Sequence, residues 1–233
     1  MSVLVVTGTG TEVGKTMVTA ALAAAALAAG WSVAVLKPAQ TGVAAGEPGD
    51  VHEVLRLAGA QVTGAELARY PEPLAPATAA RRAGARPVGP AEVAEAAAKL
   101  SAAHDLVLVE GAGGLLVRYD EEGATLADAA RLLRCPALVV APAALGTLNA
   151  TALTAEALRA REIPCMGVVV GSWPLRPGLA ELCNLEDLPL AAQAPLLGVL
   201  PHGAAHLAPE EFRAAAPGWL APGLGGTWAG TAS

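Results

Sequence analysis

Short apolar runs alternate with longer helix-like stretches along most of the chain. The apolar runs lack the polar alternation of a strand with one wet face, which is typical of parallel strands covered on both sides. They predict strands at residues 3–7, 32–37, 106–110, 137–141, 167–171 and 196–200. The stretches between them predict helices at residues 14–29, 50–58, 90–104, 125–133, 148–160 and 178–182. The alternation predicts an α/β fold, with a mostly parallel sheet and helices on both faces.

Two segments depart from this alternation. Residues 43–90 are rich in Gly, Pro and Ala, and we expect residues 69–76 to form a loop with extended stretches, because each Pro biases the preceding residue away from helix. Residues 217–233 have a similar composition, which predicts a tail that is either poorly ordered or packed as a surface strap. With 233 residues, 54% of them hydrophobic, the chain is long enough for one sizeable core. Residues 1–233 are therefore expected to form a single domain.

A phosphate-binding loop is indicated between the first predicted strand and the first helix. The sequence Thr-Gly-Thr-Gly-Thr-Glu-Val-Gly-Lys-Thr occupies residues 7–16 and leads directly into the helix. Backbone N–H groups of such a loop and of the first helical turn have no intrahelical partner and converge on a bound anion. Lys15 would add positive charge near the outer phosphates, and the Thr16 hydroxyl would ligate Mg²⁺. We therefore expect a P-loop NTPase-like fold that binds nucleotide through Glu12, Val13, Gly14, Lys15, Thr16 and Met17.

The loop departs from the usual pattern G-x-x-x-x-G-K-[ST] at its first glycine. Thr9 stands at that position, and Gly8 lies one residue early. A glycine-rich turn without a ligand is the alternative. Lysine is scarce, since the whole chain contains just Lys15, Lys37 and Lys99. A lysine within this loop therefore favours a binding loop.

Charge and hydropathy narrow the classes of partner. The net charge of −6 and the pI near 5.2 argue against general binding to nucleic acid or to an anionic membrane. The mean hydropathy of +0.47 comes mainly from alanine, and the N-terminal residues lack the basic and apolar regions of a signal peptide. Cys135, Cys165 and Cys183 are too widely spaced for a metal site and are expected to be reduced. We therefore expect a cytoplasmic protein without a membrane span.

The carboxyl ends of the predicted strands are where partners of the loop are expected, because ligands of open parallel sheets lie there. Lys37 ends the second predicted strand and would point its ammonium toward transferred phosphate. Thr41 follows it and would contact a substrate. A solvated strand end is the alternative for Lys37.

Two acids are candidates for holding Mg²⁺. Glu110 ends a buried strand and is followed by Gly111-Ala112-Gly113-Gly114. A buried carboxylate without a partner is costly, and Mg²⁺ would supply that partner. Asp50 begins a predicted helix, so it is either an N-cap or a second acid facing the metal, and its spacing does not decide between them.

Three further strand ends carry candidate binding segments. Residues 145–149 form a glycine turn before a helix start, which is either a second anion site suited to a carboxylate or an ordinary capped helix. The last two predicted strands end in residues that would form walls of a nucleobase site. These are Gly171, Ser172, Pro201, His202 and Gly203.

Four motifs in order resemble those of dethiobiotin synthetases. They are the loop at residues 7–16, Lys-Pro-Ala-Gln-Thr-Gly at 37–42, Val-Glu-Gly-Ala-Gly-Gly at 109–114 and Leu-Gly-Thr-Leu-Asn at 145–149. The family's loop has the same T-G-T-x-T-E-V-G-K-T form, which explains the shifted glycine. The resemblance extends to about His202 and is far more specific than the loop alone.

The resemblance implies a reaction of biotin biosynthesis. The family carbamoylates 7,8-diaminopelargonic acid with CO₂ or bicarbonate, phosphorylates the carbamate with a nucleoside triphosphate, and closes a cyclic urea as phosphate leaves. The nucleophiles belong to the substrate, so no covalent enzyme nucleophile is implied. The resemblance further implies Mg²⁺, ATP or another nucleoside triphosphate as co-substrate, and a homodimer with its active site at the subunit interface.

The resemblance also assigns roles to individual residues. Lys37, Lys15 and Thr11 match catalytic positions, with Lys37 stabilising the transferred phosphoryl group and the carbamate. Thr16, Asp50 and Glu110 match metal ligands, which favours the ligand over the N-cap for Asp50. Further matches are nucleotide contacts at Gly111, Ala112 and Gly113 and substrate contacts at Thr41, Leu145, Gly146, Thr147, Leu148 and Asn149. The last five belong to a loop that receives the carboxylate tail of the substrate from the neighbouring subunit.

One departure from the family concerns the nucleobase. Many members carry an Asn whose amide reads adenine where this chain has Gly171-Ser172-Trp173. We therefore expect looser or different base choice, read mainly by backbone groups near Gly171 and residues 201–203.

Two other classes of protein remain open. An amide-forming cobyrinate-type synthetase typically adds a glutamine-hydrolysing domain, for which 233 residues are expected to leave no room. A partitioning-type ATPase switch usually carries an extra lysine near the first glycine of the loop, where this chain has Gly8, Thr9 and Gly10. Turnover that depends strictly on 7,8-diaminopelargonic acid would separate a synthetase from both.

Overall fold

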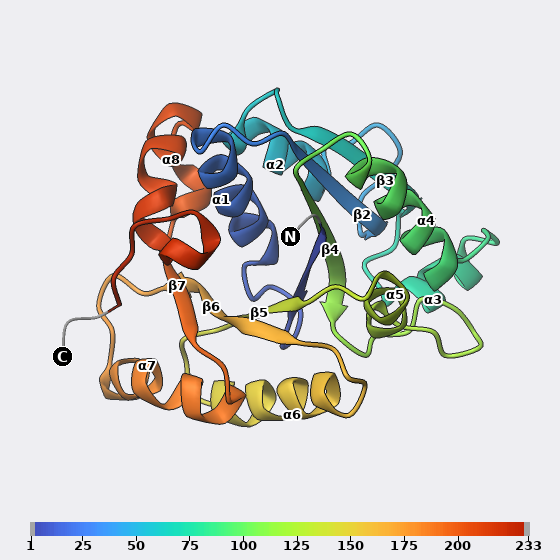
Figure 1. Cartoon of the computed structure of the whole chain (residues 1–233). Coiled ribbons are helices and arrows are strands. Elements are labelled where there is room, and N and C mark those ends of the chain that lie inside the picture. The colour runs from blue at the N-terminus through green and yellow to red at the C-terminus, as the bar shows by residue number, and fades with distance from the viewer. Residues whose placement is uncertain (1–2, 231–233) are drawn as a thin grey trace.

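The computed structural model describes residues 3–230 and is built on a seven-stranded sheet (Figure 1). The strand order is β3-β2-β4-β1-β5-β6-β7, and all neighbouring strands are parallel. The predicted α/β class with a parallel sheet is therefore confirmed. The strands are β1 Val3–Gly8, β2 Val33–Thr41, β3 Thr63–Tyr70, β4 Leu106–Gly114, β5 Ala137–Ala141, β6 Cys165–Trp173 and β7 Leu196–Pro201.

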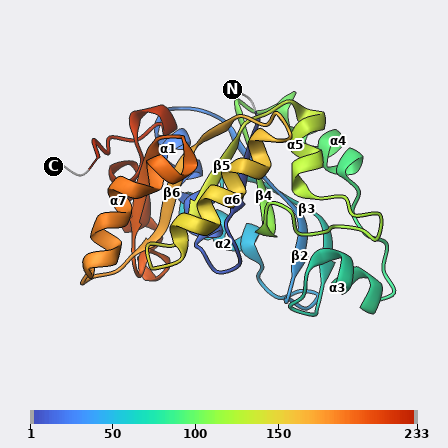
Figure 2. The same cartoon turned by 90° about the horizontal axis from the view of Figure 1, so that it is seen from below.

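Helices cover both faces of this sheet, as the sequence predicts. One face carries α1 Lys15–Ala28, α2 Asp50–Ala58 and α8 Pro209–Ala215. The other carries α3 Pro76–Arg82, α4 Pro90–Ser101, α5 Leu126–Leu133, α6 Thr147–Arg159 and α7 Leu179–Ala192. In Figure 2, α6 and α7 run side by side across the sheet. Two hydrophobic cores result, because alternate strand residues such as Leu4 and Val5 face opposite layers.

Helix α1 follows the P-loop and anchors it to the core. Its sequence is rich in alanine, which has the strongest intrinsic preference for helix, and the side chains from Val18 to Ala26 are buried. Gly30 ends the helix with φ of 84°, and Trp31 N donates to Ala26 O across the last turn. This is a Schellman motif, so the sequence sets both ends of α1 with glycines.

The edge strand β3 is an element that sequence analysis does not predict. Its residues Arg69 and Tyr70 lie within the segment expected to be a loop, and Pro76 starts α3. β3 is partly exposed along most of its length, so its sequence shows neither a fully apolar run nor a clear alternation. Pairing with β2 in register, from Ala34 opposite Thr63 to Thr41 opposite Tyr70, stabilises it.

The second strand runs four residues past its predicted end, so Lys37 lies within β2 rather than at its terminus. Pairing with β4 stops at Leu36 opposite Val109, and beyond that point β2 pairs with β3. Pro38 has no N–H group to donate to a neighbouring strand. It is tolerated here because β2 pairs at this point with β3 alone. Lys37 is 3% exposed, which contradicts a solvated strand end.

Several other boundaries differ from the predicted ones. β4 and β6 continue into their glycine-containing ends, and α4 stops at Ser101 rather than at His104. α7 extends to Ala192, well beyond the predicted residue 182. Pro189 lies inside the helix near its end, where packing of Leu188 and Ala192 into the core holds it.

The segment from residue 217 packs against the molecule as far as the structure describes it, and residues 231–233 lie outside that range. Leu220 is fully buried and forms a bridge with Gly198 of β7. Phe212 of α8 and Trp219 meet edge to face, with ring centroids 5.2 Å apart. The sequence leaves open a poorly ordered tail or a packed strap, and among the described residues these side chains add to the core over α1. In residues 3–230, no helix has the length and apolar character needed to cross a membrane.

Candidate functional site

The P-loop, residues 7–16, runs from β1 to α1 at the carboxyl edge of the sheet. Gly14 precedes α1 with φ of 93°, a left-handed conformation that favours glycine. A Cβ at this position would lie 2.6 Å from the carbonyl oxygen of Gly171 on β6. Lys15 Nζ donates a hydrogen bond of 2.8 Å to Gly10 O and so spans the loop. The start of α1, with its unpaired backbone N–H groups, is thereby held at the sheet edge where ligands bind.

Lys37 connects a cluster of polar groups beside the P-loop. Its Nζ forms ion pairs with Asp50 and with Glu110 Oε1, the latter at 2.8 Å, and donates to Gly111 O at 3.2 Å. Thr16 Oγ1 donates to the same Glu110 oxygen at 2.9 Å. Residues of α1, β2, α2 and β4 therefore meet at one point, which the order of strands brings about.

The two lysines of the site have opposite electrostatic environments. Burial alone lowers the pKa of Lys37, but the Glu110 and Asp50 carboxylates outweigh burial and raise the pKa above its ordinary value. Burial lowers the pKa of Lys15 to about 8, and repulsion from Lys37 adds to this effect against the attraction of Glu110 and Asp50. Lys37 therefore stays charged at neutral pH, while Lys15 titrates near the physiological range.

Glu110 keeps one carboxylate oxygen available for a cation. Its side chain is 1% exposed, and within residues 3–230 its Oε2 has no hydrogen-bond partner. A buried oxygen of this kind beside the Thr16 hydroxyl and the Asp50 carboxylate suits Mg²⁺, which takes one or two carboxylates and fills its shell with water and phosphate oxygens. No cluster of three or more His, Cys, Asp or Glu residues suited to a metal occurs in the described part of the chain, but phosphate ligands make such a cluster unnecessary. The residues present therefore fit Mg²⁺.

These groups surround a cavity of about 350 Å³. Its lining includes most of the residues singled out from the P-loop, β2, α2 and β4. They are Thr11, Glu12, Gly14, Lys15, Thr16, Met17, Lys37, Thr41, Asp50, Glu110, Ala112 and Gly113. Ala39 and Gln40 also line it, although sequence analysis does not single them out. Both lie between Lys37 and Thr41 on one strand, and this position in the sequence could have identified them.

Gly171 and Val13, both expected to contact nucleotide, pack against one another, and neither lines this cavity. A Cβ on Gly171 would lie 2.0 Å from Val13 O and 2.8 Å from Val140 Cγ1. The P-loop therefore occupies the space into which a side chain at position 171 would project. This contact accounts for a glycine at position 171 in this chain.

The other residues expected around a nucleobase lie where β6 and β7 end together. Ser172 Oγ and His202 Nδ1 are 3.3 Å apart, and His202 N donates to Trp173 O at 2.7 Å. Pro201 ends β7, and Gly203 turns the chain with φ of 83°. None of these residues lines the 350 Å³ cavity, but they follow Gly171 at the same edge of the sheet.

Residues 145–149 lead into α6 and do not line the cavity. Gly146 precedes the helix with φ of 92°, and Leu145 is 84% exposed. Thr147 is buried with an unpaired hydroxyl in the described structure, while Leu148 packs against the core and Asn149 is exposed. Within one described chain, this segment therefore does not meet the cavity that contains Lys37.

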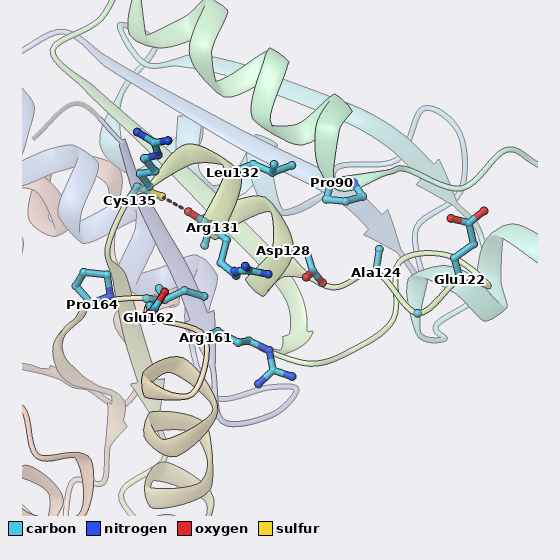
Figure 3. A pocket seen from close by; sticks show the side chains of 14 residues that line it. Pro90, Glu122, Ala124, Asp128, Arg131, Leu132, Cys135, Arg161, Glu162 and Pro164 are labelled. Atoms are coloured by element: carbon cyan, nitrogen blue, oxygen red, sulfur yellow. Dashed lines mark hydrogen bonds between the residues drawn. The ribbon is translucent and has the colours of Figure 1, made fainter.

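A larger hollow of about 830 Å³ lies elsewhere on the molecule, along α5 (Figure 3). Figure 3 shows Asp128 and Arg131 of α5 on one side and Arg161, which follows α6, on the other. Cys135 and Pro164, which also line it, precede β5 and β6, so this end of the hollow lies opposite the P-loop edge of the sheet. We place the functional site at the smaller cavity, because buried charges converge there.

Known proteins resemble this chain over most of its length. A family model described as an AAA domain matches residues 2–209. The ATP-dependent dethiobiotin synthetase BioD of Streptomyces avermitilis is 72% identical to the chain, over 98% of this chain and 95% of that protein. The protein of the same name from Saccharopolyspora erythraea is also 72% identical, over 98% of this chain and 99% of that one.

Solved structures of P-loop NTPases share the fold. The cell division ATPase MinD of Pyrococcus furiosus matches with a TM-score of 0.60 at 18% identity, over 91% of this chain and 89% of that one. The cell division protein FtsY of Thermotoga maritima matches with a TM-score of 0.51 at 20% identity, over 92% and 68% of the two chains. Identity this low shows the fold alone, whereas the 72% identity over nearly the full length shows that the chain belongs to the dethiobiotin synthetase family.

Proposed function

We propose that this chain is an ATP-dependent dethiobiotin synthetase, a ligase of biotin biosynthesis that acts on 7,8-diaminopelargonic acid. The observation that carries the proposal is the contact of Lys37 with Asp50, Glu110 and Gly111 directly beside the P-loop. A charged ammonium and two acids beside the P-loop support binding of the terminal phosphate of a nucleotide held by that loop.

The proposed chemistry uses nucleophiles of the substrate. One substrate amine attacks CO₂ to give a carbamate, and a carbamate oxygen then attacks the terminal phosphorus of ATP as ADP leaves. The second amine attacks the carbonyl carbon of the mixed anhydride, which expels phosphate and closes the cyclic urea. Lys37 and Lys15 would neutralise charge that develops on the transferred oxygens, and the backbone N–H groups of the P-loop would hold the triphosphate in place.

Thr16, Asp50 and Glu110 would hold Mg²⁺, consistent with the unpaired buried oxygen of Glu110. The ion would supply further positive charge to the phosphate oxygens when bound. In this chain, Lys37 keeps the two acids close together by offsetting their repulsion, and Thr16 orients Glu110 through its hydroxyl. The three free cysteines fit a reduced compartment such as the cytoplasm.

We also propose a homodimer in which residues 145–149 of one copy complete the site of the other. This segment does not line the described cavity of its own chain, which supports a role across an interface, and the exposed Leu145 and Leu153 offer an apolar surface there. The backbone N–H groups at the start of α6 would receive the carboxylate tail of the substrate.

Phosphate release tests the proposed reaction. It is measured with Mg²⁺, bicarbonate and each nucleoside triphosphate, with and without 7,8-diaminopelargonic acid, and the product is identified by its mass. Release that requires the diamine and yields dethiobiotin is the expected result. Release indifferent to the diamine would instead indicate a nucleotide switch or another synthetase.

The same assay, run with the triphosphates in competition, tests base choice. Gly171 has no side chain with which to read adenine, and the P-loop fills the space beside it. We therefore expect weak discrimination among the bases, so a strict preference for ATP at equal concentrations would contradict this part of the proposal.

Mixing two inactive variants tests the composite site. Lys37→Met removes a group of the cavity, and Gly146→Trp blocks the start of α6. If one site uses both segments from different copies, an equal mixture that exchanges subunits regains about a quarter of the wild-type activity, because half of the dimers contain one intact site. A mixture that stays inactive after exchange would refute the shared site.

A further inference from the structure

Gln40 is a buried amide at the edge of the cavity, and its contacts go to the backbone. It lies on β2 and is 4% exposed. Its Oε1 accepts a hydrogen bond of 2.8 Å from Asp50 N, and its Nε2 donates to Thr41 O at 3.2 Å. The side chain therefore links the strand that carries Lys37 to the first residue of α2.

The bond to Asp50 replaces a local helix cap. Gly49 occupies the N-cap position of α2 and has no side chain with which to satisfy the first N–H groups. The side-chain oxygen of Gln40, on β2, accepts a hydrogen bond from the N–H group of Asp50 and so takes the place of an N-cap side chain. The bond thus fixes the backbone from which the Asp50 carboxylate reaches Lys37.

Arg69 of β3 contacts the loop that leads into Asp50 and α2. Its guanidinium donates to Glu47 O at 2.6 Å and to Ala44 O at 3.2 Å, which restrains the loop before α2. Glu66 orients it through two hydrogen bonds, of 3.0 and 2.7 Å. Arg69 and Gln40 are opposite one another in the register of β3 and β2.

Gly49 lies between these two side chains. A Cβ there would be 2.8 Å from Gln40 Oε1 and 2.9 Å from Arg69 Nη2. The lack of a side chain at position 49 therefore permits both contacts, and β3 gains a role in the site although it lies at the far edge of the sheet.

We propose that Gln40, backed by Arg69, is a positioning residue that sets where Asp50 presents its carboxylate to Mg²⁺ and to Lys37. This inference rests on the proposed function for the identity of the ligand. The hydrogen bond itself is a property of the free protein and is measured independently.

Gln40→Met tests the contact, because methionine has a similar volume and no acceptor for the Asp50 N–H group. Gln61→Met is the matched control, since Gln61 is exposed and lies outside the cavity. Hydrogen exchange of the Asp50 amide in the free protein is expected to accelerate about tenfold in Gln40→Met and to be unchanged in the control. Unchanged exchange in Gln40→Met would overturn the proposed contact, whatever the enzyme catalyses.

A double-mutant cycle with Asp50→Asn tests whether Gln40 acts through Asp50. The free Mg²⁺ concentration that half-saturates the ATP-bound protein, followed by calorimetry, is expected to rise about tenfold in Gln40→Met, which is typical of groups that orient metal ligands. In the Asp50→Asn background the same change is expected to have almost no further effect. An equal tenfold effect in both backgrounds, or no effect in either, would overturn the positioning role. A wild-type protein that forms no dethiobiotin, yet shows this coupling, would overturn the proposed function alone.

Discussion

At the residue scale, Lys15 and Lys37 have identical side chains but different charge behaviour, because their neighbours differ. Lys37 is enclosed by two acids and remains charged, and it holds those acids together at the cavity wall. Lys15 is buried with less compensation, so its charge depends on pH. The scarcity of lysine in the chain indicates that these positions matter, but the difference between them comes from their neighbours.

Replacing Lys37 by methionine is expected to lower kcat about 10² to 10³-fold, the typical loss for one preorganised donor to a developing anion. The KM for nucleotide is expected to change much less, because the P-loop supplies most of the contacts to the triphosphate. Steady-state kinetics of dethiobiotin formation measures both constants. Lys99→Met is the control, since Lys99 is exposed on α4 and pairs with Glu95. Turnover near the wild-type value in Lys37→Met would refute the assigned role.

Nucleotide affinity is expected to decrease as the pH rises above about 8. The pKa of Lys15 is lowered to about 8 in the free protein, and an anionic triphosphate binds the protonated form better. The affinity should therefore be constant below this pH and weaken toward about tenfold per pH unit above it. Calorimetric titration of MgATP between pH 6.5 and 9.5 measures the effect. Lys15→Arg, which stays charged, should remove the dependence, and a flat wild-type profile would contradict the lowered pKa.

At the element scale, α1 is flanked by two glycines that have the same backbone conformation and different surroundings. Gly14 and Gly30 have φ of 93° and 84°. Gly14 lies against the backbone of Gly171, whereas a Cβ on Gly30 would meet no described atom within 4 Å. Gly14 must therefore lack a side chain to pack against Gly171, in addition to adopting a positive φ.

Gly14→Ala and Gly30→Ala separate these two requirements. Each is expected to lower the free energy of unfolding by about 1 kcal/mol or more, because alanine is strained at positive φ. Gly14→Ala must also displace the P-loop from β6, so its nucleotide affinity is expected to fall at least about tenfold, while Gly30→Ala keeps wild-type affinity. Chemical denaturation and nucleotide titration measure the two effects. Equal nucleotide affinity in the two variants would show that the contact with Gly171 is unimportant.

At the scale of the whole molecule, the C-terminal segment closes the core over α1. Leu220 and Phe212 are fully buried there, and an isolated bridge joins Leu220 to Gly198 of the edge strand β7. This packing connects residues after 209 to the first helix, and so supports the element that carries the P-loop.

Leu220→Ala is expected to lower the free energy of unfolding by about 2 to 5 kcal/mol, as for other buried leucines replaced by alanine. For a domain of this size, the corresponding decrease in Tm is on the order of 10 °C. Leu190→Ala is the matched control, because Leu190 is 74% exposed on α7. Calorimetry or thermal circular dichroism measures both variants, and a Tm within a degree or two of wild type in Leu220→Ala would show that the segment contributes little to the core.

The sequence by itself determined the class of the fold and the location of the P-loop. Fully apolar strand runs and alanine-rich helices are local patterns, and Gly14-Lys15-Thr16 after a strand is recognisable without a structure. The same holds for Lys37 and Glu110, because polar residues stand out at the end of apolar runs. The resemblance of four motifs also indicated the family, which the relatives confirmed.

The tertiary structure decided the features that depend on residues far apart in the chain. β3 is stabilised by pairing with β2, and Gln40 becomes a cap of α2 because the loop before Asp50 returns to the strand. The same holds for the buried ion pairs of Lys37, the lowered pKa of Lys15 and the contact of Gly171 with Val13. Local sequence carries little trace of these contacts, because burial, dielectric environment and backbone clashes are set by neighbours that the chain brings together when it folds.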